Sequence, residues 1–95
     1  MNLNITYRHL DSTPSLDEKI KSKAEGLSKY FHGNLDIHWV CSVEDGRHIS
    51  EVNVHSGKIY FHAKSESDTL YKTFDEVIHK LDAQIRKKKE QIAAH

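Results

Sequence analysis

Residues 37–64 read IHWVCSVEDGRHISEVNVHSGKIYFHAK, and in them three segments of alternating apolar and polar side chains are separated by two turn signals. Asp45-Gly46 is a strong signal for a two-residue hairpin, because both residue types tolerate the positive φ that such a turn requires. Ser56-Gly57 is a weaker signal of the same kind. This pattern predicts three consecutive antiparallel strands.

The two turns also predict how these strands pair. The first turn places Val52 opposite Trp39, and the second places Phe61 opposite Val52 and Ile59 opposite Val54. Apolar side chains then meet apolar side chains on one face of the sheet. A shift of one residue would move them to the other face, so both turns favour the same register.

The N-terminal segment adds a strand and a helix. Residues 3–8 alternate apolar and polar side chains, which predicts a half-buried strand. A helix follows, with Thr13 as its N-cap and Pro14 at its first position, and Gly33-Asn34 predicts its end. The crossover from this strand through the helix to the next strand is expected to be right-handed, so the two strands should lie parallel.

The C-terminal segment predicts a second, longer helix. Its apolar side chains recur at helical spacing and form one stripe, made of Leu70, Phe74, Val77, Ile78, Leu81 and Ile85. Because each helix must bury an apolar stripe and the sheet has one apolar face, both helices are expected to cover that face. The prediction is a single α+β domain over residues 1–95, a two-layer β-α-β-β-β-α fold with a four-stranded mixed sheet.

The composition excludes several classes of protein. A chain of 95 residues with 37% hydrophobic and 29% charged residues suits one folded domain and not a disordered chain. A single cysteine cannot form an internal disulfide, which is typical of a reducing compartment. Because the sequence has no long apolar run and no N-terminal signal pattern, neither a membrane span nor secretion is expected, and the expected location is the cytoplasm.

The basic residues are unevenly distributed although the net charge is zero. Four consecutive cations fall in about one turn of the second helix, namely Arg86, Lys87, Lys88 and Lys89. Such a cluster favours an anionic partner, of which nucleic acid is the usual one. The alternative interpretation is a solvated helix end, where cations also interact favourably with the helix dipole.

Helical spacing places other lysines beside the apolar stripes. Lys19 and Lys23 share one flank of the first helix, and Lys80 and Lys87 share one flank of the second. Lys88 lies in line with the apolar stripe, which predicts that the second helix extends beyond the sheet. Two basic flanks on neighbouring helices are expected to line one groove that follows a phosphate backbone. The candidate RNA-binding residues are Lys19, Lys23, Lys29, Lys80, Arg86, Lys87, Lys88 and Lys89.

Particular residues along nearly the whole chain also carry a family resemblance. They are Leu3-Asn4-Ile5-Thr6, Lys23, Leu27, Tyr30-Phe31, Val43-Glu44, His62-Ala63, Leu70-Tyr71, Phe74-Asp75, Lys80-Leu81, Gln84-Ile85, Lys87 and Lys89. In order and spacing, these residues resemble the ribosome hibernation promoting factors, a family also called ribosome-associated inhibitors or sigma-54 modulation proteins.

The resemblance implies a fold like a double-stranded-RNA-binding domain with an extra first strand. It also implies binding to the small ribosomal subunit, in the channel used by messenger RNA and transfer RNA. In that channel Lys23, Lys80, Lys87 and Lys89 are the residues expected to contact ribosomal RNA. Occupying the channel would inhibit translation and promote ribosome hibernation in stationary phase and under stress.

The chain departs from the family pattern in two ways. Gly26 and Ala83 stand where the family often has basic residues, and Lys29, Arg86 and Lys88 are the candidates to compensate. The chain also ends just after the second helix, whereas long members carry a second domain and inhibitor-type short members carry an extra tail. The resemblance therefore implies a short hibernation factor, monomeric off the ribosome, that needs a separate ribosome modulation factor to form ribosome dimers.

No residues are arranged for catalysis. Cys41 alternates into the core, and Asp75 and Glu76 have no partner placed for acid–base chemistry. The eight histidines lack tight metal-binding spacing, although the predicted register places His62 opposite Glu51, so neither a metal nor a cofactor is expected. The prediction is a non-enzymatic protein. Two alternatives to the ribosome-binding function are a free-standing double-stranded-RNA-binding module and a protein-interaction module that modulates transcription.

Overall fold

The computed structural model describes residues 1–93, and its elements follow the predicted order. They are β1 (Asn2–Arg8), α1 (Pro14–Ser28), β2 (Asp36–Glu44), β3 (Arg47–Ser56), β4 (Ile59–Ser67) and α2 (Leu70–Ala93). The β-α-β-β-β-α prediction is therefore confirmed. Within residues 1–93, neither helix combines the length and the apolar character needed to cross a bilayer.

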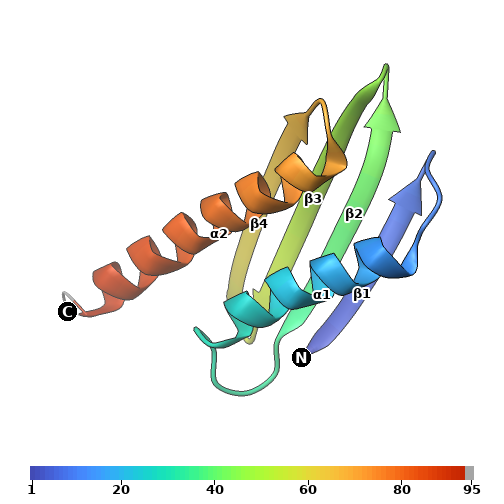
Figure 1. Cartoon of the computed structure of the whole chain (residues 1–95). Coiled ribbons are helices and arrows are strands. Elements are labelled where there is room, and N and C mark those ends of the chain that lie inside the picture. The colour runs from blue at the N-terminus through green and yellow to red at the C-terminus, as the bar shows by residue number, and fades with distance from the viewer. Residues whose placement is uncertain (94–95) are drawn as a thin grey trace.

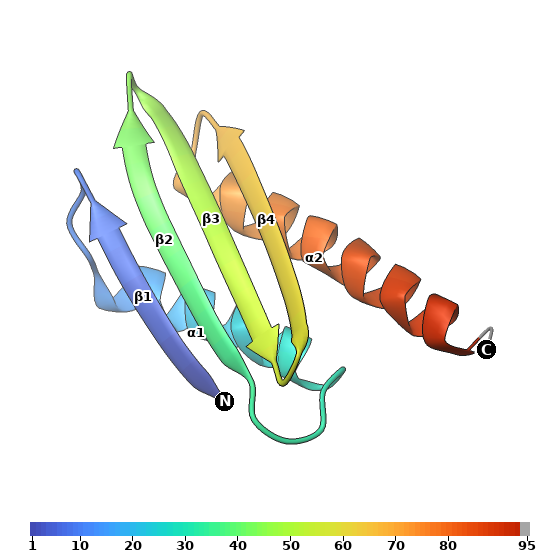
Figure 2. The ribbon, with the colours of Figure 1, turned by 180° about the vertical axis from the view of Figure 1, so that it is seen from behind.

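The four strands form one sheet in the order β1-β2-β3-β4. β1 is parallel to β2, and the other two pairs are antiparallel, as the right-handed crossover predicted. Both helices cover the same face of this sheet (Figure 1), and the view from behind shows the opposite face uncovered (Figure 2). The two-layer arrangement is thus confirmed, and β1 and β4 are the edges of the sheet.

The first hairpin has the predicted register, with Val52 opposite Trp39. The second prediction was wrong by two residues, because Phe61 lies opposite Val54 and Ala63 lies opposite Val52. A shift of two residues keeps every side chain on its own face, so the apolar pattern could not distinguish the two registers.

The cause of this difference lies in the turn itself. Ser56 remains in β3 opposite Ile59, so the two-residue loop is Gly57-Lys58 and not Ser56-Gly57. Gly57 has a φ of +60°, which suits the first loop position. The Ser56 hydroxyl also donates a hydrogen bond of 3.2 Å to the Asn34 carbonyl.

The start of α1 was predicted correctly and its end was not. Thr13 is the N-cap, and its hydroxyl accepts a hydrogen bond of 3.1 Å from the backbone N–H of Leu16. The helix ends at Ser28, five residues before the predicted Gly33. Single turns follow it, because the Phe31 ring packs against Phe61, with centroids 6.3 Å apart, instead of continuing the helical stripe.

The core lies between the sheet and the helices and contains a buried row of hydrogen bonds. The Trp39 ring meets Phe74 edge-on at 5.5 Å, and neither side chain is exposed to solvent. Trp39 donates from its indole nitrogen to the Ser50 hydroxyl at 3.2 Å, and that hydroxyl lies 2.8 Å from the hydroxyl of Thr73. These hydrogen bonds give partners to the polar groups that the three residues bring into the core.

Cys41 lies in this core, as predicted, and its titration gives a test of burial. Desolvation raises the pKa of the thiol from 9.0 to about 11. The folded state therefore keeps a proton that the unfolded state releases, so this contribution to stability is complete below pH 9 and is lost as the pH rises toward 11.

We expect the free energy of unfolding to fall over that pH interval, and to fall less steeply in a Cys41→Ala variant. Urea unfolding of both proteins at a series of pH values measures the two slopes. Tyr7 also has a raised pKa, caused first by burial and then by its hydrogen bond to Asp17. Because both proteins contain Tyr7, the difference between their two slopes reports on Cys41. Equal slopes would contradict the burial of the thiol.

The C-terminal part of α2 extends beyond the sheet, as Lys88 predicted (Figure 1). Ile85 is the last buried residue of the helix, with 1% of its surface exposed, and residues 86–91 are all exposed. The four consecutive cations therefore project from the end of the helix, where solvent surrounds them.

Candidate nucleic-acid interface

The line of contact between the two helices, called here the helix seam, has two contacts with α2. Lys23 of α1 meets Asp75, and Tyr30, in the turn after α1, meets Asp82. The Lys23 ammonium lies 2.5 Å from a carboxylate oxygen of Asp75, and the Tyr30 hydroxyl donates a hydrogen bond to Asp82. Asp75 is 70% exposed, so solvent screens the ion pair and it adds little to stability. The seam nevertheless places a cation and two carboxylates side by side on the outer surface of the helix layer.

Further cations surround Tyr30 toward the end of the seam. The Lys89 ammonium lies 5.4 Å from the centre of the Tyr30 ring, and the Lys29 ammonium lies 5.9 Å from it. Arg86 forms an ion pair of 2.9 Å with Asp82, one helical turn earlier. The Tyr30 side chain, followed by the Asp82 carboxylate, raises the pKa of Arg86, so the guanidinium charge is held firmly.

Lys80 lies on the other flank of α2, beside β4. Its ammonium donates a hydrogen bond of 2.6 Å to the backbone carbonyl of Lys64, and Gln84 donates one of 2.8 Å to the carbonyl of His62. Both carbonyls belong to the edge strand of the sheet, so these side chains cover backbone acceptors that would otherwise face solvent. Lys87 follows Lys80 by two helical turns and lies on the same flank.

The expectation of one groove between two basic flanks was therefore wrong. Lys19 and Lys23 lie on the side of α1 that faces α2, but Lys80 and Lys87 lie on the side of α2 that faces away from α1. Spacing shows that two residues share a flank, but it does not show which neighbour that flank meets. The structure instead places basic residues along both sides of α2, a seam strip and an edge strip.

The seam strip consists of Lys19, Lys23, Arg86 and Lys89, and the edge strip consists of Lys80 and Lys87. Both strips border the outer surface of the helix layer. Lys29 follows α1 as its C-cap, and Lys88 lies in line with the buried stripe but beyond the end of the sheet, where it is exposed. All eight candidate residues therefore belong to the helix layer or its projecting end.

The uncovered face of the sheet holds polar and aromatic side chains. His62 lies 2.8 Å from Glu51, the predicted contact, although the strand partner of Glu51 is Lys64 and the contact is diagonal. Tyr60 donates to Asn53 at 2.7 Å. Among the described residues, no group of three or more histidine, cysteine or acidic side chains could hold a metal ion.

Comparison with known proteins decides the family. The family model described as "Sigma 54 modulation protein / S30EA ribosomal protein" matches residues 3–93, almost the whole chain. The chain belongs to this family. The resemblance seen in the sequence is thereby confirmed.

Two curated relatives and one solved structure show how closely the chain follows members of the S30EA family. It is 32% identical over 95 residues to a ribosome hibernation promoting factor of Salmonella typhimurium, with all of both chains covered. It is 29% identical to the ribosome-associated factor Y of Haemophilus influenzae, covering 92% of this chain and 81% of the relative. A ribosomal subunit interface protein from Coxiella burnetii superposes with a TM-score of 0.84 at 28% identity, covering 95% of this chain and 99% of the other.

In this S30EA family member, the acidic partners of the candidate cations are the part of the site that the sequence analysis missed. Lys23 and Asp75 are 52 residues apart, and no local pattern links them. The same separation divides Tyr30 from Asp82. The pair of Asp82 and Arg86 could have been found, because residues four apart on a helix are neighbours.

Proposed function

We propose that this protein binds the small ribosomal subunit, occupies the channel for messenger RNA and transfer RNA, and thereby inhibits translation and promotes ribosome hibernation in stationary phase. The single observation that carries the proposal is the pair of basic strips on the outer surface of the helix layer. Full-length relatives named as hibernation promoting factors support it. The protein would act in the cytoplasm by occupying the ribosomal channel, without catalysing a chemical reaction.

The contacts to ribosomal RNA are assigned to Lys19, Lys23, Lys29, Lys80, Arg86, Lys87, Lys88 and Lys89. Within residues 1–93, only Lys23 and Arg86 of this set have a carboxylate partner. Lys80 is held by a neutral carbonyl, which orients its ammonium without cancelling the charge. The strips are therefore net positive although the whole chain is neutral, and charges beyond about 8 Å are screened at physiological salt.

Recognition is expected to rest on phosphate positions and RNA shape, because the cations of the strips are suited to phosphate oxygens. Such recognition suits A-form RNA, whose deep major groove is poorly accessible to side chains. One copy would fill the channel, and a separate ribosome modulation factor would be needed for ribosome dimers. With about five or six phosphates neutralised, the logarithm of affinity should fall with the logarithm of salt with a slope of roughly −4 to −5.

Binding measurements on purified components test the proposal. The protein is titrated with small subunits, large subunits and a naked RNA duplex, each over a series of salt concentrations. We expect strong preference for the small subunit together with the steep salt slope. Equal affinity for the duplex would instead favour a free-standing double-stranded-RNA-binding module. Failure to bind either RNA would favour a protein-interaction module that modulates transcription.

Asp75 provides a further test, because its charge opposes phosphate binding at the seam. Replacing Asp75 by Asn frees the Lys23 ammonium and removes one negative charge from the proposed interface. We expect affinity for the small subunit to rise by about 2- to 5-fold, in line with the small energies of exposed ion pairs. The matched control is Asp68→Asn, which breaks the pair with Lys72 at the far end of α2 and should change nothing. Weaker binding of the Asp75 variant would contradict the assigned role.

A further inference from the structure

The two edges of the sheet are protected to different degrees. On β4, side chains of α2 bind the carbonyls of His62 and Lys64. On β1, the N–H of Asn2 donates to the Leu35 carbonyl of the loop before β2 at 2.8 Å. Alternate residues of a strand turn their backbone groups in opposite directions, so the groups of Leu3, Ile5 and Tyr7 face outward. No side-chain hydrogen bond within residues 1–93 covers them.

β1 also lacks the features that usually keep an edge strand from pairing. Residues 2–7 contain no charged residue and no proline, and the strand pairs with β2 residue by residue without a bulge. Its side chains Leu3, Ile5 and Tyr7 are only partly buried against the core. Arg8, at the end of β1, is its one charged residue. An edge that is uncharged over residues 2–7 and has outward backbone groups is a template for another strand.

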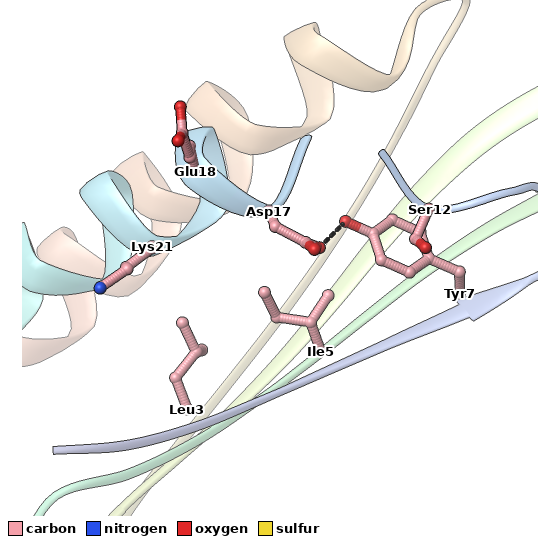
Figure 3. Close-up of a pocket in the computed structure, with 7 residues that line it drawn as sticks. All are labelled: Leu3, Ile5, Tyr7, Ser12, Asp17, Glu18 and Lys21. Carbon is pink, nitrogen blue, oxygen red and sulfur yellow. Dashed lines mark hydrogen bonds between the residues drawn. The ribbon is translucent and has the colours of Figure 1, made fainter. Parts of the chain in front are cut away.

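A cavity of about 410 Å³ lies between this strand and α1 (Figure 3). Leu3, Ile5 and Tyr7 form its apolar wall, and Asp17, Glu18 and Lys21 of α1 form its polar rim. The Tyr7 hydroxyl donates to Asp17 at 2.7 Å. α1 runs opposite to β1, so Lys21 lies toward Leu3 whereas Asp17 lies over Tyr7 (Figure 3).

We infer that the β1 edge is a docking surface for a second copy of this chain, which adds its own β1 in antiparallel orientation. In the register centred on Ile5, each Ile5 faces its copy and Leu3 faces Tyr7. These are the residues whose backbone groups face outward, so each facing pair exchanges both of its N–H···O bonds. The pairing joins two sheets into one, and both pairs of helices lie on the same face of it.

Charge complementarity selects this occupant and this register. A two-fold axis at Ile5 brings Lys21 of one copy toward Asp17 and Glu18 of the other, on both sides of the axis. On the uncovered face Asn4 meets Thr6 and Asn2 meets Arg8, so no like charges face each other. The seam and edge strips lie away from β1 and remain free. Because the interface is small, association is reversible and depends on concentration. The free protein would therefore be the expected monomer at low concentration and a dimer at high concentration, and this association does not depend on the proposed ribosome binding.

Sedimentation velocity over protein concentrations from ~10 µM to ~1 mM, the range in which small interfaces associate, tests this inference. The wild-type protein should pass from monomer to dimer. Lys21→Glu places like charges across the two-fold axis and should weaken dimerisation at least ~10-fold, as unfavourable charge pairs do. Adding Glu18→Lys to that variant restores opposite charges and should restore the dimer. Lys58→Glu, at the remote β3–β4 turn, is the matched control and should behave as the wild type does.

Disulfide trapping tests the register. Asn4 and Thr6 face each other in a non-hydrogen-bonded pair, where side chains approach closely. Asn4→Cys with Thr6→Cys should therefore form covalent dimers under mild oxidation, and Asn4→Cys alone should not.

A wild-type protein that stays monomeric at every concentration tested, or a dimer that Lys21→Glu does not weaken, would overturn the inference. Lys21→Glu should still bind small subunits, so failure of the dimer is distinct from failure of the proposed function.

Discussion

Replacing Lys80 and Lys87 together by glutamate is expected to abolish binding to the small ribosomal subunit while leaving the fold intact. Both side chains are exposed, and Lys80 contributes one hydrogen bond to an edge carbonyl. The double variant removes two proposed phosphate contacts and adds two repulsive charges. Affinity should fall by roughly 100-fold or more, since each lost contact also removes its share of released counterions.

Co-sedimentation with small subunits measures this effect, and circular dichroism confirms that the variant is folded. The control is Lys21→Glu with Lys58→Glu, which changes the net charge by the same amount at positions outside both basic strips. If the control lost binding as strongly as the Lys80 and Lys87 variant, a general charge effect would explain the result. Unchanged co-sedimentation of the test variant would refute the edge strip as a contact surface.

Replacing Phe74 by alanine should have the largest effect on stability. The ring is completely buried and packs edge-on against Trp39 at the centre of the core. Truncating a buried phenylalanine costs about 3–5 kcal/mol, and a domain of this size has only about 5–15 kcal/mol in total. The variant is expected to be partly unfolded near physiological temperature.

Denaturant unfolding followed by the fluorescence of Trp39 measures the loss. Tyr71→Ala on the same helix is the matched control, because Tyr71 is 50% exposed and its removal should cost less than about 1 kcal/mol. A Phe74 variant that lost no more stability than this control would show that the contact between α2 and the sheet does not hold the core together.

Local chemistry was enough to predict most of the fold. The turn at Asp45-Gly46 gave the correct register, because its positive φ values are confined to these two residues. The second turn was predicted incorrectly, since pairing shifted by two residues preserves the apolar pattern. The structure places Gly57, with its positive φ, at the first loop position and keeps Ser56 in the strand. The end of α1 was missed because Phe31 continues the helical stripe in sequence but packs on Phe61 from a turn.

The candidate site was predictable in its residues and not in its arrangement. Periodicity placed Lys80 and Lys87 on one flank of α2, but the neighbour of that flank is set by how the helix lies on the sheet. The structure shows that neighbour to be β4. The partner of Lys23 was equally hidden, because Asp75 approaches it only when the two helices pack.

Basic strips on both sides of α2 imply a different mode of RNA binding from a single groove between the helices. A single groove between the helices would admit one strand, whereas cations on both sides of α2 would let the helix itself lie along a duplex or between two RNA segments. The carboxylates of Asp75 and Asp82 lie within the seam strip, so binding there exchanges an internal ion pair for a phosphate. On the edge strip, Glu76 lies one turn before Lys80 but accepts a hydrogen bond from Ser65, and neither Lys80 nor Lys87 forms an ion pair with a described residue. The edge strip is therefore expected to contribute more per lysine.

The most direct test is a cryo-electron microscopy structure of the protein bound to the small ribosomal subunit. We predict that the outer surface of the helix layer faces ribosomal RNA in the channel for messenger and transfer RNA. The ammonium groups of Lys80 and Lys87 should lie within about 4 Å of phosphate oxygens, the limit for an ion pair. A structure with the uncovered sheet face against the RNA, or with the protein bound outside that channel, would contradict the proposal.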